Sequence, residues 1–344
     1  MKSKCIKVCS SECSKVLKIL RSAEFIRTDL KLKKNKEFVK IPLTRASSSE
    51  LSNLLQDIEW ELCEDEFEEI SRCLTYKDLL KGILPEDVVN RLPRSYFIIG
   101  DIAVIHLPHE LLPYGRVVAD AIMKVAKNVK VVYATRGIVG DYRLMDLIHL
   151  GGEDRSWTIH KEYGVRIYVD VKKAYYNPSL SEEHRRVATK VSNDEVIIDL
   201  FAGVGPFALH ILTLRRCRVY VVDLNPSAIM CFLKSIELNR KKLKGEFVAI
   251  VGDALRLIEL IKNNCIDRII MNLPHKAVEY IPKVLSKVKV GGVLHVYCIA
   301  RNRNELVEEV MRYSRGKVRV EEVVKVLDYA PFKYIYRADL VRIT

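Results

Sequence analysis

Residues 199–206 combine a carboxylate, two glycines and a proline at a spacing that can bind a nucleotide-like ligand. The β-branched run at 196–198 predicts a strand that is buried on both faces of a parallel sheet. Gly203 and Gly205 allow a tight turn and a close approach of the backbone to a ligand, and Pro206 suits the first turn of a helix. Strand, glycine turn and helix form the entry to a nucleotide-binding α/β unit. A lone glycine pair is weak evidence, so the conclusion depends on the strands that follow.

Three further expected strands also end in a polar residue. They are the strands at 218–222, 247–251 and 268–271, which are followed by Asp223, Asp253 and Asn272. Open α/β sheets bind ligands at this carboxyl edge, and Asp223 lies twenty residues after Gly203, where such folds place the acid that binds ribose hydroxyls. Each Asp has an alternative role as the cap of the next helix. Four polar strand ends in series nevertheless favour a ligand site.

Several segments together resemble a known enzyme family. Residues 199–207 (Asp-Leu-Phe-Ala-Gly-Val-Gly-Pro-Phe), 223–226 (Asp-Leu-Asn-Pro) and 272–274 (Asn-Leu-Pro) are similar to the class I S-adenosylmethionine-dependent methyltransferases. More narrowly, they resemble the archaeal and eukaryotic tRNA (guanine-37-N1)-methyltransferases. Residues 177–184 (Asn-Pro-Ser-Leu-Ser-Glu-Glu-His) resemble that family's Asn-Pro-Arg-Leu-x-x-Glu-His segment, and 140–143 and 158–162 also have counterparts there. The resemblance extends from about residue 76 to the end and is weaker before it.

The resemblance implies S-adenosyl-L-methionine as the cofactor. It assigns the methionine end to the turn at 199–205, the ribose hydroxyls to Asp223 and the adenine neighbourhood to Asp253. The residues expected to contact the cofactor are Asp199, Phe201, Gly203, Gly205, Asp223, Leu224, Asp253, Ala254 and Asn272. No metal-binding constellation is expected, because His160, His184, His275 and His295 lie in separate segments without ligand spacing.

Methylation of N1 of guanine requires loss of the N1 proton and a hydrogen-bond donor for the charge that moves onto O6. The family motif makes Glu183 the candidate general base, Arg143 the donor to O6, and Asn272 a donor and acceptor for the mixed edge of guanine. From position alone, Glu183 is as well explained as a surface acid at the positive end of a helix. Its neighbour Glu182 is a second candidate for the same role.

The resemblance also predicts the residues that contact the substrate: Arg143, Asn177 and Pro274. Proline holds the residue before it in an extended conformation, which fixes the backbone beside Asn272. One departure from the family pattern is Ser179, which replaces the usual Arg of Asn-Pro-Arg-Leu. Any contact made by that Arg must be lost here or made by Arg185 or Arg186.

The charge of the chain indicates an anionic partner. The 344 residues carry a net charge of +13, and residues 176–344 hold 28 Lys and Arg against 19 Asp and Glu, a surplus of nine. With the resemblance, this predicts tRNA as the partner. The sequence shows no apolar run of membrane-spanning length and no signal peptide, so we expect a cytoplasmic protein without membrane contact. We also expect a monomer without an obligate protein partner.

The expected fold class is α/β, with three modules. Residues 1–75 form an N-terminal tRNA-recognition module, 76–175 a middle α/β RNA-binding module, and 176–344 a Rossmann-like methyltransferase domain with a seven-stranded, mostly parallel sheet. In the first module we expect strands near 4–8 and 38–43 and a helix after Ser47. In the second, residues 135–143 are expected to form a glycine-bracketed loop that presents Arg136 and Arg143.

Three other functions compete with this prediction. The nearest is another transferase on the same scaffold, the aminocarboxypropyl transferase of wyosine synthesis. A second is a methyltransferase that acts on a protein or small molecule. The third is a non-catalytic RNA-binding protein that keeps a degenerate Rossmann-like domain.

Overall fold

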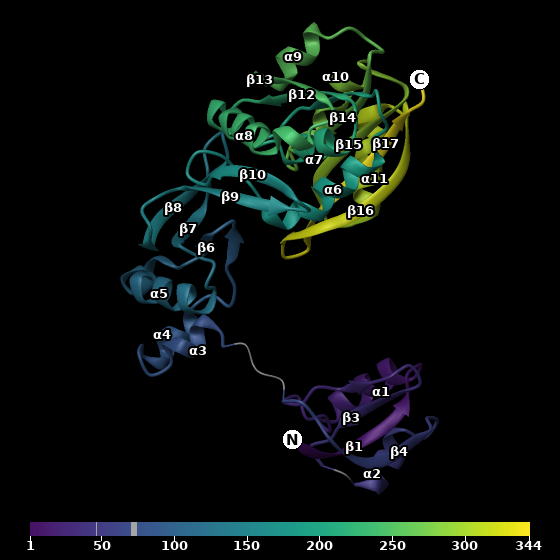
Figure 1. Ribbon diagram of the computed structural model, residues 1–344. Helices are drawn as coiled ribbons and strands as arrows, with labels where there is room; N and C mark the ends of the chain where they lie inside the picture. The colour runs from purple at the N-terminus through teal and green to yellow at the C-terminus, as the bar shows by residue number, and fades with distance from the viewer. Residues whose placement is uncertain (46, 70–73) are drawn as a thin grey trace. The chain divides into compact units, whose positions relative to one another are not determined.

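The computed structural model describes residues 1–45, 47–69 and 74–344 and divides the chain into two compact units, Met1–Thr75 and Tyr76–Thr344 (Figure 1). None of the helices in these described ranges is long and apolar enough to cross a membrane. Each unit is described by itself below.

The first unit is a four-stranded sheet in the order β2-β3-β1-β4, with helices α1 and α2. Its elements are β1 (Lys2–Cys9), α1 (Cys13–Ser22), β2 (Lys33–Lys34), β3 (Phe38–Pro42), α2 (Ser48–Leu54) and β4 (Trp60–Glu66). All of the strand pairings are antiparallel. Ser47 caps α2 by accepting the N–H of Glu50. β4 is an acidic strand whose Asp65 lies 2.6 Å from Lys33 Nζ and 2.8 Å from Lys40 Nζ.

The second unit begins with two short helices, α3 (Tyr76–Leu80) and α4 (Glu86–Arg91), and a four-stranded sheet in the order β5-β6-β7-β8. The strands are β5 (Phe97–Ile99), β6 (Ile102–Ile105), β7 (Val131–Val139) and β8 (Leu144–Gly152), and α5 (Gly115–Val125) connects β6 to β7. The expected loop at 135–143 is therefore wrong. Val139 pairs with Leu144, so β7 continues into a hairpin and only residues 140–143 form the turn.

A second hairpin connects this sheet to the seven-stranded sheet of the C-terminal half. β9 (Trp157–Glu162) and β10 (Val165–Asp170) lie beside helix α8 (Pro226–Asn239) (Figure 1). The N–H of Tyr168 donates to Ser235 Oγ over 2.8 Å, and the N–H of Arg166 donates to Asn239 Oδ1 over 3.0 Å. The apolar core is continuous from β5–β7 through this hairpin to α8. The hairpin therefore packs as part of the same apolar core as α7 (Pro206–Leu214) and α8.

The third sheet has seven strands in the order β13-β12-β11-β14-β15-β17-β16. They are β11 (Val196–Asp199), β12 (Arg218–Asp223), β13 (Glu246–Val251), β14 (Ile266–Met271), β15 (Val288–Ala300), β16 (Val318–Ala330) and β17 (Lys333–Arg342). β17 pairs antiparallel with both of its neighbours, whereas the other pairings are parallel. The expected α/β fold class, with a mostly parallel seven-stranded sheet, is confirmed.

Helices cover both faces of this sheet, because alternate strand residues point to opposite faces. Ile197 and Tyr297 pack on one face with α6 (Ser181–Lys190), α7 (Pro206–Leu214) and α8. Ile198 and Val296 pack on the other face with α9 (Ala254–Leu260), α10 (Ile281–Leu285) and α11 (Arg303–Ser314). The polar ends of the central strands are thus left at one edge between the two helical layers.

Candidate active site

The parallel register brings three of the expected polar residues to one edge of the sheet. Asp199 ends β11, Asp223 ends the adjacent β12, and Asn272 follows β14 on the other side of β11. β11 is paired to both strands, so the edge is built around Asp199. This is the edge at which open α/β sheets bind their ligands.

Asp199 is fully buried, and neither of its carboxylate oxygens has a hydrogen-bond partner among the described residues. Burial, and then the nearby charge of Asp223, raise the pKa of Asp199 to about 8. A buried carboxylate without donors is costly. The described residues supply no hydrogen-bond donor to this carboxylate. A ligand with a cationic or hydrogen-bond-donating group could supply one.

The glycine turn is held by Asp223. Its Oδ2 accepts the N–H of Gly203 over 2.7 Å, and its Oδ1 accepts the N–H of Asn225 over 2.8 Å. Burial raises the pKa of Asp223. Gly205 adopts a φ of 73° directly before α7, and a Cβ there would lie 2.3 Å from the ring of Phe232. The turn therefore cannot accept a side chain at Gly205 without displacing that ring.

The remaining cofactor candidates lie around this edge with differing exposure. The ring of Phe201 stacks on Tyr280 at 6.0 Å, and Leu224 is 52% exposed. Asp253 is exposed and caps α9 by accepting the N–H groups of Leu255 and Arg256, so the capping role weighed for it is present. Ala254 is buried in the first turn of α9. The unpaired Asp199, the tight turn and the Asp223 carboxylate fit S-adenosylmethionine, whose ammonium and hydroxyl groups are donors.

The segment before α6 lies against the glycine turn. A Cβ on Gly203 would lie 3.3 Å from the carbonyl oxygen of Tyr175. Asn225 Nδ2 donates to the carbonyl of Lys173 over 2.7 Å. Asn177 accepts the N–H of Ser179 over 3.0 Å, which turns the chain into a short 3-10 helix and then α6. The substrate candidate Asn177 is therefore fixed close to the cofactor edge.

Arg143 gathers with residues from three other segments. It stands in the turn between β7 and β8 with a φ of 54°, and its guanidinium lies 5.5 Å from the centre of the Tyr175 ring. Burial, and then the charge of Arg143, lower the pKa of His275, which follows Pro274 in the loop after β14. His275 Nε2 also lies 3.3 Å from the hydroxyl of Tyr329 near the end of β16. Arg143 and Pro274 were predicted from the sequence as site residues, whereas Tyr175 and Tyr329 were not.

Glu183 lies on the buried side of α6, not on its surface. It is 7% exposed, whereas Glu182 is exposed. Its Oε2 accepts the hydroxyl of Tyr297 over 3.1 Å and pairs with Nε of Arg337 at 2.8 Å. Neither Tyr297 nor Arg337 was predicted from the sequence as a partner of Glu183.

Arg185 and Arg186 have other partners near Ser179. The Arg185 guanidinium lies 5.6 Å from the centre of the Tyr163 ring, and Arg186 Nη2 lies 2.5 Å from Glu322 Oε1. Ser179 itself is exposed. Both arginines already have partners within the protein. Neither is therefore available only to make the contacts of the Arg that the family has at position 179.

Two of the four histidines named above are fully buried beside carboxylates. His184 lies 2.9 Å from Glu162, and His295 lies 2.6 Å from Asp339. Burial opposes ionisation of Glu162, but hydrogen bonds from His184 and His210 hold its pKa well below the usual range. Within the ranges 1–45, 47–69 and 74–344, no group of three or more His, Cys, Asp or Glu could hold a metal ion.

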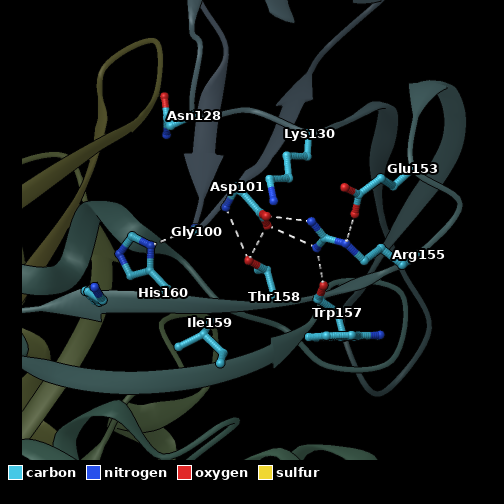
Figure 2. Close-up of a pocket in the computed structure, with 11 residues that line it drawn as sticks. Gly100, Asp101, Asn128, Lys130, Glu153, Arg155, Trp157, Thr158, Ile159 and His160 are labelled. Carbon is cyan, nitrogen blue, oxygen red and sulfur yellow. Dashed lines mark hydrogen bonds and ion pairs between the residues drawn. The ribbon is translucent and has the colours of Figure 1, made fainter.

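A cavity of about 690 Å³ lies elsewhere, between the β5–β8 sheet and β9 (Figure 2). It contains none of the expected site residues. Its Arg155 donates to both oxygens of Asp101 at 3.0 and 2.5 Å and to Glu153 at 2.7 Å. These internal pairs neutralise the guanidinium, so the strand-end edge remains the better candidate for chemistry.

The sequence and the fold of this chain are both similar to those of known proteins. Residues 158–329 match the model of the TRM5/TYW2 methyltransferase domain, and residues 76–155 match the TYW2 N-terminal domain. The Pyrococcus abyssi tRNA (guanine(37)-N(1))-methyltransferase Trm5b is 37% identical over 81% of this chain and 84% of its own. Its crystal structure has a TM-score of 0.71, covering 99% of this chain and 100% of that one at 32% identity.

Two further relatives extend the comparison. Trm5b of Methanocaldococcus jannaschii is 30% identical over 97% of both chains. The tRNA 4-demethylwyosine(37)-methyltransferase Taw21 of Saccharolobus solfataricus is 36% identical over 71% of this chain and 92% of its own. A solved complex of aTrm5 with tRNALeu has a TM-score of 0.69 at 29% identity, covering 99% of each chain. With half of its length inside the family model and relatives that align almost end to end, this chain belongs to the TRM5/TYW2 methyltransferase family.

Proposed function

We propose that this protein transfers a methyl group from S-adenosyl-L-methionine to N1 of guanosine 37, next to the anticodon, in tRNA. The observation that carries the proposal is the similarity to a tRNA (guanine(37)-N(1))-methyltransferase over 97% of both chains. The positions of Glu183, Arg143 and Asn272 support it, because each lies buried or half-buried in the unit that holds the glycine turn.

The cofactor supplies an electrophilic methyl group when it is bound. Asp199 and the glycine turn hold the amino-acid end, and Asp223 accepts hydrogen bonds from the ribose hydroxyls while it also holds the turn. Phe201 and Leu224 offer apolar surface, and Asp253 and Ala254 line the adenine end. Asn272, at the end of β14, borders both ligands.

The protein's own chemistry is proton removal and charge stabilisation. Glu183 takes the proton from N1 of guanine, and Arg143 donates to O6, where negative charge develops. Asn272 presents both a donor and an acceptor to the base edge, and Asn177 and Pro274 hold the backbone around it. Arg143 belongs to a hairpin turn and Glu183 to α6, so two packed elements must be correctly placed for the reaction.

The anionic partner in this proposal is tRNA, which the surplus of nine positive charges in residues 176–344 supports. The three-module division at residues 75 and 175 is part of the proposal, with the first module recognising tRNA. The β9–β10 hairpin, near the end of the middle module, contacts α8 of the methyltransferase domain through Tyr168 and Arg166. We further propose a cytoplasmic monomer that needs no protein partner.

Methylation of 4-demethylwyosine at the same tRNA position is the second candidate. It is favoured by the 36% identity with Taw21. That relative is a shorter chain, since 71% of this chain already covers 92% of it, whereas Trm5b of M. jannaschii matches almost end to end. Because the match to Trm5b covers almost the whole chain, we favour guanosine over 4-demethylwyosine as the substrate.

The test is mass spectrometry of nucleosides from tRNA incubated with the protein and S-adenosylmethionine. We expect 1-methylguanosine from tRNA that carries an unmodified guanosine 37, and S-adenosylhomocysteine as the co-product. Product only from tRNA that carries 4-demethylwyosine would support the second candidate. Methylthioadenosine as the co-product would instead indicate aminocarboxypropyl transfer, and absence of any product would refute both methyl-transfer proposals.

A further inference from the structure

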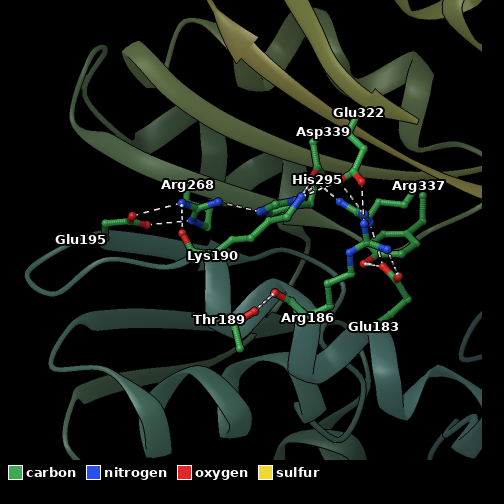
Figure 3. Close-up of polar contacts among 11 residues, drawn as sticks. Glu183, Arg186, Thr189, Lys190, Glu195, Arg268, His295, Glu322, Arg337 and Asp339 are labelled. Carbon is green, nitrogen blue, oxygen red and sulfur yellow. Dashed lines mark hydrogen bonds and ion pairs between the residues drawn. The ribbon is translucent and has the colours of Figure 1, made fainter. Parts of the chain in front are cut away.

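The two carboxylate oxygens of Glu183 have different surroundings. Oε2 receives the hydroxyl of Tyr297 at 3.1 Å and lies 2.8 Å from Nε of Arg337. For Oε1, the shortest contact with a charged side chain among the described residues is Arg186 Nη1 at 3.7 Å, beyond hydrogen-bonding distance. Figure 3 shows the Glu183 carboxylate facing the Arg337 guanidinium. One oxygen is therefore held, while the other has no hydrogen-bond partner among the described residues.

Arg337 is itself fixed from several sides. It is fully buried, and it pairs with Glu322 at 3.1 Å and with Asp339 as well as with Glu183. Asp339 in turn lies 2.6 Å from His295 Nδ1 and 2.6 Å from Lys190 Nζ. Burial alone would lower the pKa of Arg337, but Asp339 and Glu183 raise it above its usual value. The guanidinium is thus a permanently charged and immobile anchor.

The strand register places this anchor next to the candidate active site. Met271 ends β14 and pairs with Val296, so Asn272 directly follows β14 while Tyr297 is the next residue along β15. Tyr297 pairs with Arg337 on β17. Tyr297 and Arg337 therefore stand side by side on two neighbouring strands, next to the strand end that Asn272 follows, and Glu183 contacts both from α6.

We propose that Tyr297 and Arg337 are positioning residues that hold Oε2 of Glu183 and leave Oε1 as the atom that receives the N1 proton. The inference rests on the proposed function. In this step the N1–H bond breaks, its electron pair stays on N1, and the proton bonds to Oε1. Glu183 becomes neutral, yet Arg337 keeps Asp339 and Glu322 as partners. An unpaired buried charge would be strongly unfavourable. The proton transfer avoids this, because the Arg337 guanidinium still has carboxylate partners after Glu183 becomes neutral.

The charged and titratable groups facing Glu183 come from four elements. They are His184 and Arg186 on α6, Tyr297 on β15, Glu322 on β16, and Arg337 and Asp339 on β17. Hydrogen bonds to a carboxylate favour its ionised form. A change in the pH dependence of the reaction on loss of the Tyr297 hydroxyl would therefore report the loss of this hydrogen bond.

The experiment measures single-turnover formation of 1-methylguanosine between about pH 5.5 and 9 for the wild type and for Tyr297→Phe. We expect the variant to be slower by roughly 5- to 50-fold at neutral pH, within the range that general-base catalysis contributes. Its acid limb should move to higher pH, so that part of the lost rate returns in alkaline solution. Affinities for cofactor and tRNA should remain as in the wild type.

Arg337→Lys is the second variant, because lysine keeps the charge but cannot hold the same forked geometry. Its rate should fall further than that of Tyr297→Phe. Arg268→Lys is the matched control, since Arg268 is also a buried arginine but pairs with Glu195 at 2.7 Å, and its contact with His295 links it indirectly to the partners of Arg337. We expect it to lower the melting temperature without moving the acid limb.

Two results would overturn the inference, and they are distinguishable. If the wild type forms 1-methylguanosine and a folded Tyr297→Phe variant shows an unchanged rate and pH profile, the positioning role is refuted while the proposed function stands. If the wild type forms no 1-methylguanosine, the proposed function fails, and the inference fails with it. Should Arg337→Lys not fold, Tyr297→Phe alone decides the matter.

Discussion

Asp199 and Asp223 end two neighbouring parallel strands and place two largely buried carboxylates at one edge of the sheet. Burial, and then the charge of Asp223, raise the pKa of Asp199 to about 8, and burial raises that of Asp223. Two such acids resist being ionised together. A ligand that brings a cation and hydroxyl donors to this edge would relieve that repulsion, so cofactor binding and protonation are coupled here.

Asp199→Asn should therefore stabilise the cofactor-free protein while weakening the cofactor complex. The folded-state pKa of Asp199 lies above its unfolded value of about 3.9. The wild type is thus most stable below about pH 4 with respect to this group, and it loses that stability as the pH rises towards about 8. Asparagine does not titrate, so the variant avoids the loss.

Thermal unfolding of the two proteins between pH 5 and 8 checks this prediction. The stability advantage of Asp199→Asn should grow with pH by up to about 1.4 kcal/mol per unit. Calorimetry with S-adenosylmethionine should show lower affinity for the same variant. A pH-independent difference in stability would contradict the assigned ionisation of Asp199.

Asp223→Ala should lower the affinity for S-adenosylmethionine by about one to two orders of magnitude. Hydrogen bonds to a charged group contribute roughly 1.5–3 kcal/mol, and this carboxylate also holds the N–H groups of Gly203 and Asn225. Calorimetry measures the affinity, and circular dichroism verifies folding. A folded variant with wild-type affinity would remove Asp223 from the cofactor site.

Glu183→Gln should slow single-turnover methylation by about 10²–10⁴-fold while both ligands still bind, because glutamine cannot accept the proton. Glu182→Gln is the internal control. Glu182 is exposed on α6, whereas Glu183 is buried against Tyr297 and Arg337. A slow Glu182→Gln beside a normal Glu183→Gln would mean that the family motif is aligned one residue out of register.

The strand ends could be predicted from the sequence because each depends on a local pattern. A β-branched run followed by Asp199, or by Asp223 after 218–222, marks both the strand and its carboxyl end. Parallel pairing then brings these ends together without further information. The α/β fold class could be predicted for the same reason, whereas the methyltransferase type was implied by the resemblance of the motifs to a known family.

The surroundings of Glu183 could not be predicted in this way. Tyr297 is 114 residues away, and only the packing of α6 onto β15 brings the two together. Arg337 enters through the antiparallel insertion of β17 between β15 and β16. Single-sequence patterns do not report such non-local partners, and the same holds for the end of β7, where residues within 135–139 pair with β8 although they were expected to belong to a loop.

Arg143→Lys should lower the single-turnover rate by about 10²–10³-fold, the usual effect of removing a donor to developing negative charge. Lysine keeps the charge but lacks the planar fork of donors. The backbone change is small, since Arg143 already has a φ of 54° and lysine meets the same steric limits there. Rapid-quench methylation at saturating tRNA and cofactor measures the chemical step, and filter binding measures tRNA affinity.

Arg136→Lys provides the matched control in the same hairpin. Arg136 lies on β7 with a half-exposed side chain and pairs with Asp146 on β8 at 2.8 Å, so its guanidinium is directed to a partner within the sheet. We expect this variant to retain the wild-type rate. Equal losses in the two variants would show that the hairpin tolerates no lysine for structural reasons. A normal rate in Arg143→Lys would exclude its guanidinium from stabilising O6, and the donor would then have to be sought at Asn272.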